Sequence, residues 1–212
     1  LTWGETVEIA KLLTRTEDGV QYRGWDTDSV SRMFGPLSLV HIEARTNQVI
    51  VNNEGYKRAF ETTKQFFSIP GNEYGTAEGS PIDRFLMQKD LAMITTVNLF
   101  LRLREITDLE WDVAQYPSYP ERPDTYGMYD LHIAIPMSMS EHRDAQMRVF
   151  EVLFSDEIQT EMVSKSGKVS VLRDPKYNEM FLRDIPEMAG KNIAGVFKSK
   201  PAPAPEYSEY WG

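Results

Sequence analysis

The stretch IAIPMSMSEHRDAQMRVFEVLFSDEIQTEM, residues 133–162, decides the predicted fold class. It begins like a β-strand, continues through a turn of small residues, and then shows two helical segments separated by a stop. A strand that feeds directly into helices is typical of an α/β protein. Neither helix carries an obvious catalytic residue, so both are expected to pack rather than react. In the first helix, one buried face is predicted from four apolar positions: Ala145, Val149, Val152 and Leu153.

Outward from this stretch, helices and strands alternate through the middle of the chain. The pattern predicts strands at 89–97, 111–117 and 128–137, with a helix at 97–106. Residues 117–127 are rich in proline and are predicted to form a loop. This alternation predicts a mixed sheet covered by helices. From Pro175 onward the periodicity weakens, and the Pro-rich end is expected to lie extended against a surface or to hang free.

The first half of the chain carries clear capping signals. Thr2 and Glu5 have the spacing of a capping box, and Asn53 precedes a second helical pattern. Val20 and Tyr22 suggest a short strand, and residues 37–53 read as a hairpin around a turn. Because the chain opens one residue before a helix cap, we expect it to be an excised piece of a longer protein. The second helix is predicted to place six residues on one face: Tyr56, Ala59, Phe60, Thr63, Phe66 and Phe67.

Composition excludes several classes of function. The 212 residues are 41% apolar and 26% charged, as in an ordinary globular protein. The net charge of −9, with scattered basic residues, argues against nucleic-acid binding. The absence of cysteine excludes disulfides, thiolate catalysis and cysteine metal sites. No apolar run approaches the roughly 18 residues of a membrane-spanning helix, and no basic, apolar leader opens the chain.

Catalytic motifs are absent from the sequence. His41, His132 and His142 lack metal-binding spacing, and no nucleophile elbow, P-loop or dinucleotide fingerprint occurs. No carboxylate pair stands in an apolar setting that would favour acid–base work. The sequence therefore gives no positive sign of an enzyme, and it implies no cofactor and no metal.

Aromatic residues near acids and turns are the candidates for ligand binding. Trp25 stands beside Asp26 and Asp28 in a segment of turn composition, and four tyrosines flank the Pro-rich loop. Stacking combined with hydrogen bonds is how a protein holds a ligand that is polar but has an apolar face, such as a sugar. The alternative is that these aromatics simply pack the loops. The four tyrosines are Tyr116, Tyr119, Tyr126 and Tyr129.

The order of several motifs resembles the family-1 extracellular solute-binding proteins of bacterial ABC importers. The predicted strand that contains Ile135, together with the segment 137–172 that follows it, is similar to that family's strand–helix–helix stretch. The matching residues are Ile135, Ser140, His142 and Ala145, then Ser155, Glu157, Gln159 and Gly167. TWGETVEIAKLLT at 2–14, FLMQKDLAMI at 85–94 and WDVAQYPSYPE at 111–121 resemble further landmarks of the family. The resemblance extends from Thr2 to about Leu172. Lys89 and Asp90 replace the usual glycine, and the familiar Trp after this segment is missing.

The resemblance implies a periplasmic-binding-protein-like fold of type II, in which two lobes close around a ligand. Residues 1–174 are then expected to be mostly the second lobe with crossover elements, and 175–212 a weakly structured segment. Thr95, Thr96 and Asn98 would face the ligand in place of the missing Trp. The implied partners are a carbohydrate and a membrane permease, and the implied location is extracellular, as a cell-surface lipoprotein or a periplasmic protein.

Two functions follow from these patterns. The first is a non-enzymatic module that captures an oligosaccharide or sugar in a cleft between lobes. The second is an α/β carbohydrate-active enzyme in which Asp26 and Asp28 perform the chemistry. Intact glycan after incubation would favour the first function, and product formation that is lost in Asp26→Ala would favour the second.

Overall fold

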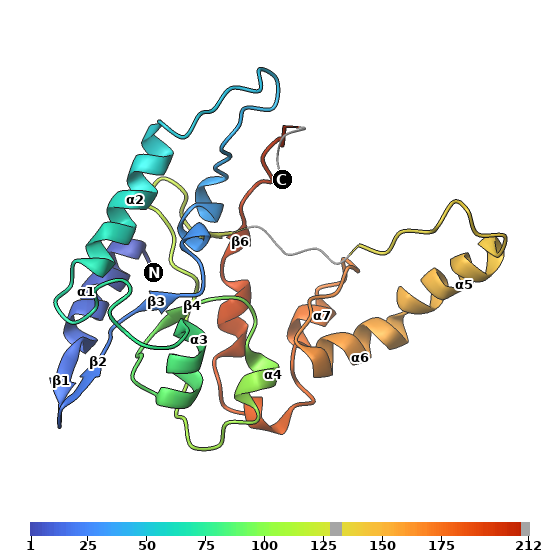
Figure 1. Cartoon of the computed structure of the whole chain (residues 1–212). Coiled ribbons are helices and arrows are strands. Elements are labelled where there is room, and N and C mark those ends of the chain that lie inside the picture. The colour runs from blue at the N-terminus through green and yellow to red at the C-terminus, as the bar shows by residue number, and fades with distance from the viewer. Residues whose placement is uncertain (128–132, 209–212) are drawn as a thin grey trace. The chain divides into compact units, whose positions relative to one another are not determined.

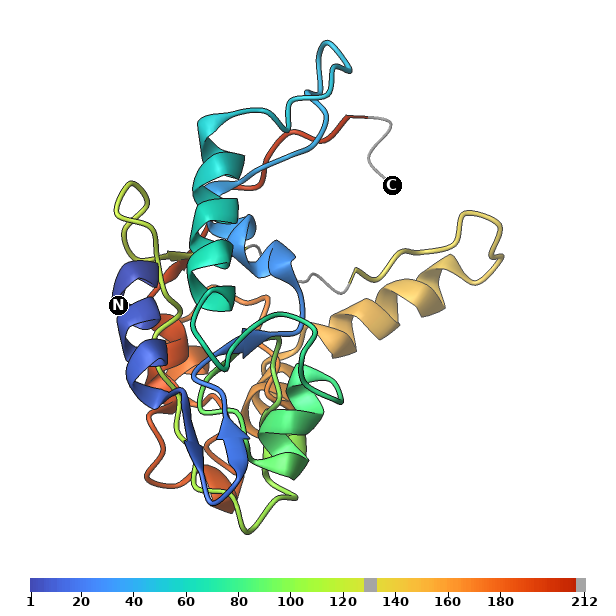
Figure 2. The same ribbon diagram turned by 60° about the vertical axis from the view of Figure 1, so that its left-hand side comes forward.

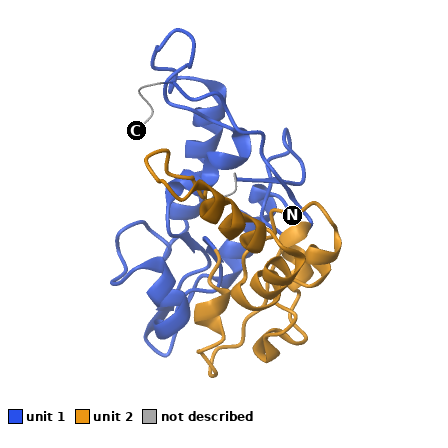
Figure 3. Ribbon diagram, turned by 90° about the vertical axis from the view of Figure 1, so that its right-hand side faces the viewer, with its two compact units in different colours: residues 1–97, 115–129, 198–212 blue, residues 98–114, 130–197 orange. Residues whose placement is uncertain are grey.

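The computed structural model describes residues 1–127 and 133–208 (Figure 1). The chain forms two compact units, each assembled from separate stretches (Figure 3). Unit 1 comprises residues 1–97, 115–129 and 198–212, and unit 2 comprises 98–114 and 130–197. The division expected at residue 174 does not coincide with a boundary of either unit, and the assignment of lobes stays a prediction.

Unit 1 opens with helix α1 (Trp3–Leu13), which begins where the capping box predicts. The Thr2 hydroxyl accepts from the Glu5 amide at 3.2 Å, and the Glu5 carboxylate accepts from the Thr2 amide at 2.7 Å. Strands β1 (Arg15–Glu17) and β2 (Val20–Tyr22) then form an antiparallel pair. The capping box and the strand at Val20–Tyr22 are therefore confirmed.

A short parallel pair lies at the centre of unit 1. Strand β3 (Asp26–Thr27) pairs with β4 (Ile94–Thr95) in the register Asp26 to Ile94 and Thr27 to Thr95. An isolated bridge between Arg23 and Leu91 extends the contact. The strand predicted at 89–97 therefore exists, but it is shorter than predicted. Helix α3 (Pro81–Asp83) contacts β3, and the π-helix η3 (Arg84–Gln88) follows directly after α3.

Helix α2 (Glu54–Phe67) lies beside α1 in both ribbon views (Figures 1 and 2). Asn53 caps it, as predicted, by accepting from the Tyr56 amide at 3.1 Å. The buried face consists of Tyr56, Ala59, Thr62 and Phe66. Phe60 was predicted to share this face, but it is exposed because it lies on the outer side of the helix.

The segment between β3 and α2 contains two 3-10 turns, η1 (Val30–Met33) and η2 (Gly35–Leu37). The hairpin predicted at 37–53 is reduced to one antiparallel bridge between Ile42 and Val49. Near the end of unit 1, β5 (Thr125–Tyr126) pairs in parallel with β6 (Lys200–Pro201). The Pro-rich end thus lies extended against unit 1 at residues 200–202, which was one of the two expectations.

The core of unit 1 joins residues that are far apart in sequence. Trp25 stacks on Phe66 with ring centroids 4.0 Å apart, and Trp3 meets both rings edge-on. The burial of such large aromatic side chains is the main stabilising term available to a unit of this size. The buried cluster consists of Trp3, Val7, Ala10, Trp25, Met33, Ala59, Phe66, Ile69 and Tyr119.

Unit 2 is mainly helical in its described part. Phe181 packs edge-on against both Phe100 and Phe197. Residues 175–197 contribute buried side chains, so they are more ordered than the weak periodicity suggested. The helical segments are α4 (Phe100–Leu103), α5 (Arg143–Leu153), α6 (Asp156–Ser166), α7 (Lys176–Glu179), η4 (Pro186–Met188) and η5 (Ile193–Phe197).

Helix α5 corrects one prediction. The helix exists, but it has no buried residue, and Val149 and Val152 are 56% and 58% exposed. Figure 1 shows α5 extending beyond α6, with no other helix of unit 2 alongside it. The prediction of a buried face is therefore wrong for the described structure, in which Ala145, Val149, Val152 and Leu153 are all exposed.

Several predicted elements of the middle region also differ. The helix predicted at 97–106 is limited to α4, and residues 111–117 form no strand. Residues 133–137 form no strand either, while 128–132 of the same prediction lie outside the described residues. Over residues 1–127 and 133–208, helices are combined with three two-stranded sheets, which is consistent with the α/β class, and these residues do not form the one covered sheet that was predicted.

Candidate ligand-binding site

The carboxyl ends of β3 and β4 bring predicted site residues together within unit 1. Because the two strands are parallel, Asp28 and Thr96 follow strands that end at the same edge. Ligands of α/β proteins bind outside the carboxyl ends of parallel strands. We therefore take this place, defined by Asp26, Asp28, Thr96 and Arg32 and called the β3–β4 edge below, as the candidate site.

Asp28 is the most firmly oriented group of the β3–β4 edge. Arg32 donates to it twice, from Nε to Oδ1 at 3.0 Å and from Nη2 to Oδ2 at 2.9 Å. The pair joins Asp28, which precedes η1, to Arg32 within η1. The Asp28 side chain is 18% exposed and the Arg32 side chain is 31% exposed. A fork of this kind fixes the plane of the carboxylate and leaves its remaining lone pairs available.

The electrostatics keep Asp28 ionised. Burial raises the pKa of Asp28, but the hydrogen bonds and charge of Arg32 outweigh burial, so the pKa lies below its ordinary value. Asp28 is accordingly a charged hydrogen-bond acceptor at neutral pH.

Asp26 has different surroundings. Its Oδ1 accepts from the Thr27 amide at 2.8 Å, and its Oδ2 lies 3.7 Å from Nη1 of the buried Arg84. Arg84 is closer to Asp90, at 3.2 Å. Burial raises the pKa of Asp26, and the charges of Arg84 and Arg23 only partly compensate. Asp26 therefore belongs to a buried ion-pair cluster that supports β3 from below the edge.

Trp25 and Thr95 are wrong as ligand contacts. Trp25 is 1% exposed and its Nε1 donates to Oγ1 of Thr95 at 3.0 Å, while Thr95 is 7% exposed. The Thr27 hydroxyl also donates to the Thr95 carbonyl oxygen at 2.7 Å. Both predicted residues hold the core together, because Trp25 finds aromatic partners in α1 and α2 that its local sequence does not reveal.

Tyr119 is also wrong as a ligand contact. It is 1% exposed, and its hydroxyl donates to the carbonyl oxygen of Met33 at 3.1 Å. Tyr129 lies outside the described residues, so its predicted role stays untested.

Asn98 makes its hydrogen bonds within unit 2. It belongs to unit 2, where its Nδ2 donates to the Gly167 carbonyl oxygen. Its Oδ1 accepts from the Phe100 amide at 3.0 Å, next to the start of α4. The amide group therefore connects two turns of unit 2; the residue itself is exposed, and its predicted contact with a ligand stays a prediction.

Sequence reasoning missed two contributors to this site. Arg32 follows Asp28 by four residues, a spacing that signals a local ion pair. Arg84 carries no such signal, since its partner Asp26 is distant in sequence. Thr96 is half-buried beside Asp28, so of the predicted residues Asp26, Asp28 and Thr96 are the ones that the fold brings together.

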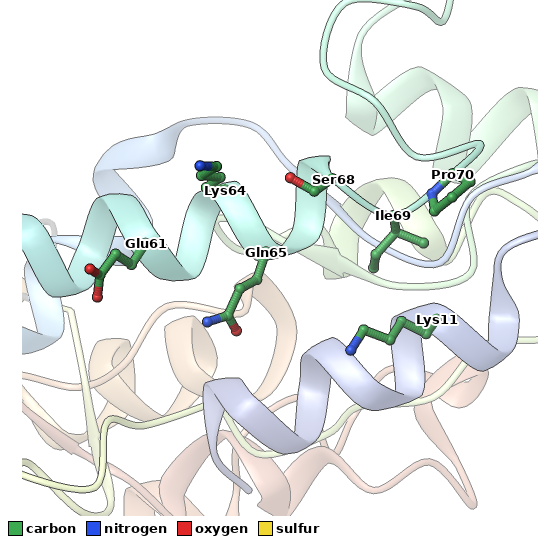
Figure 4. A pocket seen from close by; sticks show the side chains of 7 residues that line it. All are labelled: Lys11, Glu61, Lys64, Gln65, Ser68, Ile69 and Pro70. Atoms are coloured by element: carbon green, nitrogen blue, oxygen red, sulfur yellow. The ribbon is translucent and has the colours of Figure 1, made fainter.

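Two grooves are lined by other residues. One of about 520 Å³ runs between α1 and α2, where Lys11, Lys64 and Gln65 project from the helix surfaces (Figure 4). Its Lys11 is already paired with Glu8 at 2.6 Å. The other, of about 330 Å³, lies between α5 and Ala134 and Pro136 in unit 2. Neither contains a predicted ligand contact.

Within residues 1–127 and 133–208, no cluster of His, Asp and Glu could hold a metal ion. Over the same residues, no helix has the length and apolar character needed to span a membrane. No protein-family model, curated protein or solved structure matches this chain.

Proposed function

We propose that this chain is the ligand-capturing part of a solute-binding protein of an ABC importer. In this proposal it binds an oligosaccharide or sugar without converting it, and a membrane permease receives the ligand. The protein would act outside the cytoplasmic membrane, as a cell-surface lipoprotein or in the periplasm. The finer fold assignment, a lobe of the type II periplasmic-binding-protein architecture, belongs to the same proposal.

One observation carries the proposal: Asp28 is a partly exposed carboxylate, fixed by the Arg32 fork at the carboxyl ends of two parallel strands. Sugars present hydroxyl donors in fixed directions, and a rigid charged acceptor binds such donors more strongly than a neutral group does. The Thr96 hydroxyl is buried nearby, so Asp28 is the group that would meet the ligand. The β3–β4 edge therefore supplies one wall of a site for a neutral, hydroxyl-rich ligand.

An aromatic surface for the sugar ring must come from residues other than Trp25. Tyr116 and Tyr126 are both half-buried, with ring centroids 6.2 Å apart, and Tyr116 also contacts the site through Arg32. A half-exposed aromatic ring offers an apolar face while its hydroxyl stays hydrogen-bonded. We therefore assign any stacking contact to these tyrosines.

The motif order also supports the proposal. The TWGETVEIAKLLT segment forms α1, and the segment 85–94 leads through η3 to β4. The segment 137–172 forms two consecutive helices, α5 and α6, the second capped by Ser155 and ended by Gly167. The helices carry no catalytic group, which agrees with elements that only build a scaffold.

The second candidate is a carbohydrate-active enzyme, and one observation favours it. The surroundings raise the pKa of Asp26 and lower the pKa of Asp28, and two carboxyl groups with pKa values displaced in opposite directions can divide acid and base roles. Each group is already engaged by an arginine, however, which favours structural and binding roles.

A thermal-shift screen of the chain against a panel of sugars tests the proposal. A ligand that binds only the folded state raises the unfolding midpoint. We expect such a rise with at least one sugar, its loss in Asp28→Asn, and intact sugar after prolonged incubation. Turnover of the sugar that disappears in Asp26→Ala would replace the proposal with the enzyme.

A further inference from the structure

Two tyrosine hydroxyls donate to the last carbonyl groups of η1, the turn that contains Arg32. Tyr116 donates to the carbonyl oxygen of Arg32 at 2.7 Å, and Tyr119 donates to the carbonyl oxygen of Met33 at 3.1 Å. The last carbonyl groups of a helical turn have no partner within the turn and need one from outside. The loop 115–119 supplies both partners from more than 80 residues away.

The contact of Tyr116 leads directly to the candidate site. Its acceptor is the main chain of Arg32, and the side chain of the same residue forms the fork on Asp28. A carboxylate is held in one plane only if the guanidinium that holds it is itself fixed. The Tyr119 contact ends one residue later, at Met33, whose side chain is buried in the core.

We propose that Tyr116 is a positioning residue for the β3–β4 edge: its hydroxyl fixes the backbone of Arg32, and Arg32 in turn orients the Asp28 carboxylate. This inference rests on the proposed function, because Asp28 is there the acceptor for the sugar. It assigns to the Tyr116 hydroxyl a role in ligand affinity that is separate from any stacking contact of the ring.

The hydroxyl of Tyr116 can be removed without removing the packing of its ring. The ring packs edge-on against Trp3, with centroids 5.7 Å apart, so phenylalanine can keep this contact and lose only the hydroxyl. Burial raises the pKa of Tyr116, so the hydroxyl keeps its proton and remains a donor at neutral pH. The donor is therefore constant over the range in which the protein is measured.

Tyr116 lies next to a point where the chain passes from one unit to the other. Unit 1 resumes at Gln115, directly after the stretch 98–114 of unit 2. The residue that positions Arg32 therefore follows a passage of the chain from one unit to the other. A change in the path of this passage would reach Asp28 through two hydrogen-bonded steps.

The test compares Tyr116→Phe with Tyr119→Phe in the full chain. Each change removes one hydroxyl donor from the end of η1, but only Tyr116 contacts Arg32. The pKa of Asp28 is followed by carboxyl carbon NMR across the acid range. We expect it to rise toward the ordinary value of 3.8 in Tyr116→Phe and to stay in place in Tyr119→Phe. Arg32→Lys, which keeps the charge and loses the fork, should raise it as well.

Affinity for a sugar found in the screen gives the second readout. Loss of one hydrogen bond corresponds to roughly a threefold to tenfold weaker binding, expected in Tyr116→Phe and absent in Tyr119→Phe. An unchanged Asp28 pKa in a folded Tyr116→Phe, or equal shifts in both tyrosine variants, would overturn the inference. If the pKa shifts as expected but no sugar binds the unsubstituted chain, the positioning role stands and the proposed function fails.

Discussion

The indole Nε1 of Trp25 donates to Oγ1 of Thr95 at 3.0 Å, in the interior of unit 1. The bond joins the residue before β3 to the last residue of β4, across 70 positions of sequence. It aligns the two strands whose carboxyl ends form the β3–β4 edge. Both residues act beneath the site instead of within it.

Replacement of Trp25 should therefore affect stability strongly. Trp25→Ala removes a buried ring that stacks on Phe66 and contacts Trp3, and it leaves the Thr95 hydroxyl without its donor. We expect the free energy of unfolding to fall by about 3–5 kcal/mol, measured by urea denaturation. A loss below about 1 kcal/mol would show that Trp25 is exposed in solution.

Gly24 should tolerate no side chain. A Cβ atom at this position would lie 2.0 Å from the Ala10 carbonyl oxygen, and the backbone of α1 cannot yield without losing its packing. Gly24→Ala should cost about 2–3 kcal/mol in urea denaturation. Gly4→Ala is the control, because the nearest atom lies 4.0 Å away and the residue is within α1, where alanine stabilises by about 0.5–1 kcal/mol. Equal effects of the two changes would refute the close approach.

The two aspartates should give stability opposite dependences on pH. The folded-state pKa of Asp28 lies below 3.8, so its contribution is present above that pH and is lost as pH falls through the folded value. The folded-state pKa of Asp26 lies above 3.8, so its contribution is full below that pH and is lost as pH rises through the folded value. Unfolding free energies of Asp28→Asn and Asp26→Asn, measured from about pH 3 to about pH 7, should deviate from the parent in opposite directions. Parallel curves would refute the assignment.

Helix α5 should accept a charge on its apolar side. Val149 is 56% exposed, so Val149→Asp should change the free energy of unfolding by no more than about 1 kcal/mol. Val163 in α6 is 1% exposed, and Val163→Asp should unfold unit 2 because the charge would be buried without a partner. Circular dichroism and denaturation of both variants make the comparison. Unfolding by Val149→Asp would mean that the face is covered in solution.

Local signals predicted the fold best. Thr2 with Glu5, and Asn53 with Tyr56, interact within three residues, so their spacing alone determines the caps. The surroundings of Trp25 depend on Phe66, which belongs to another helix. The turn composition around Trp25 therefore led to the wrong expectation of exposure. The α5 periodicity correctly predicts a helix, but burial requires a covering element that periodicity cannot supply.

The candidate site likewise combines contacts that local sequence predicts with contacts between distant residues. Thr96 lies within the strand predicted at 89–97, and the Arg32 fork on Asp28 has a local spacing that sequence can reveal. The Tyr116 contact spans 84 positions and arises only when the loop 115–119 returns to η1. Asn98 is polar and lies two residues after Thr96 in sequence, but its amide is engaged within unit 2.

Calorimetric titration of the chain with the best sugar from the screen tests directly whether Asp28 binds the sugar. A site with one wall is expected to bind with roughly millimolar affinity, about −4.1 kcal/mol. Asp28→Asn should weaken this binding about tenfold or more, because it removes a charged acceptor. Asp18→Asn is the matched control, since Asp18 is an exposed turn residue at φ 51°, a conformation that asparagine also adopts. Equal affinity of the unsubstituted chain and of Asp28→Asn would show that Asp28 does not bind the sugar.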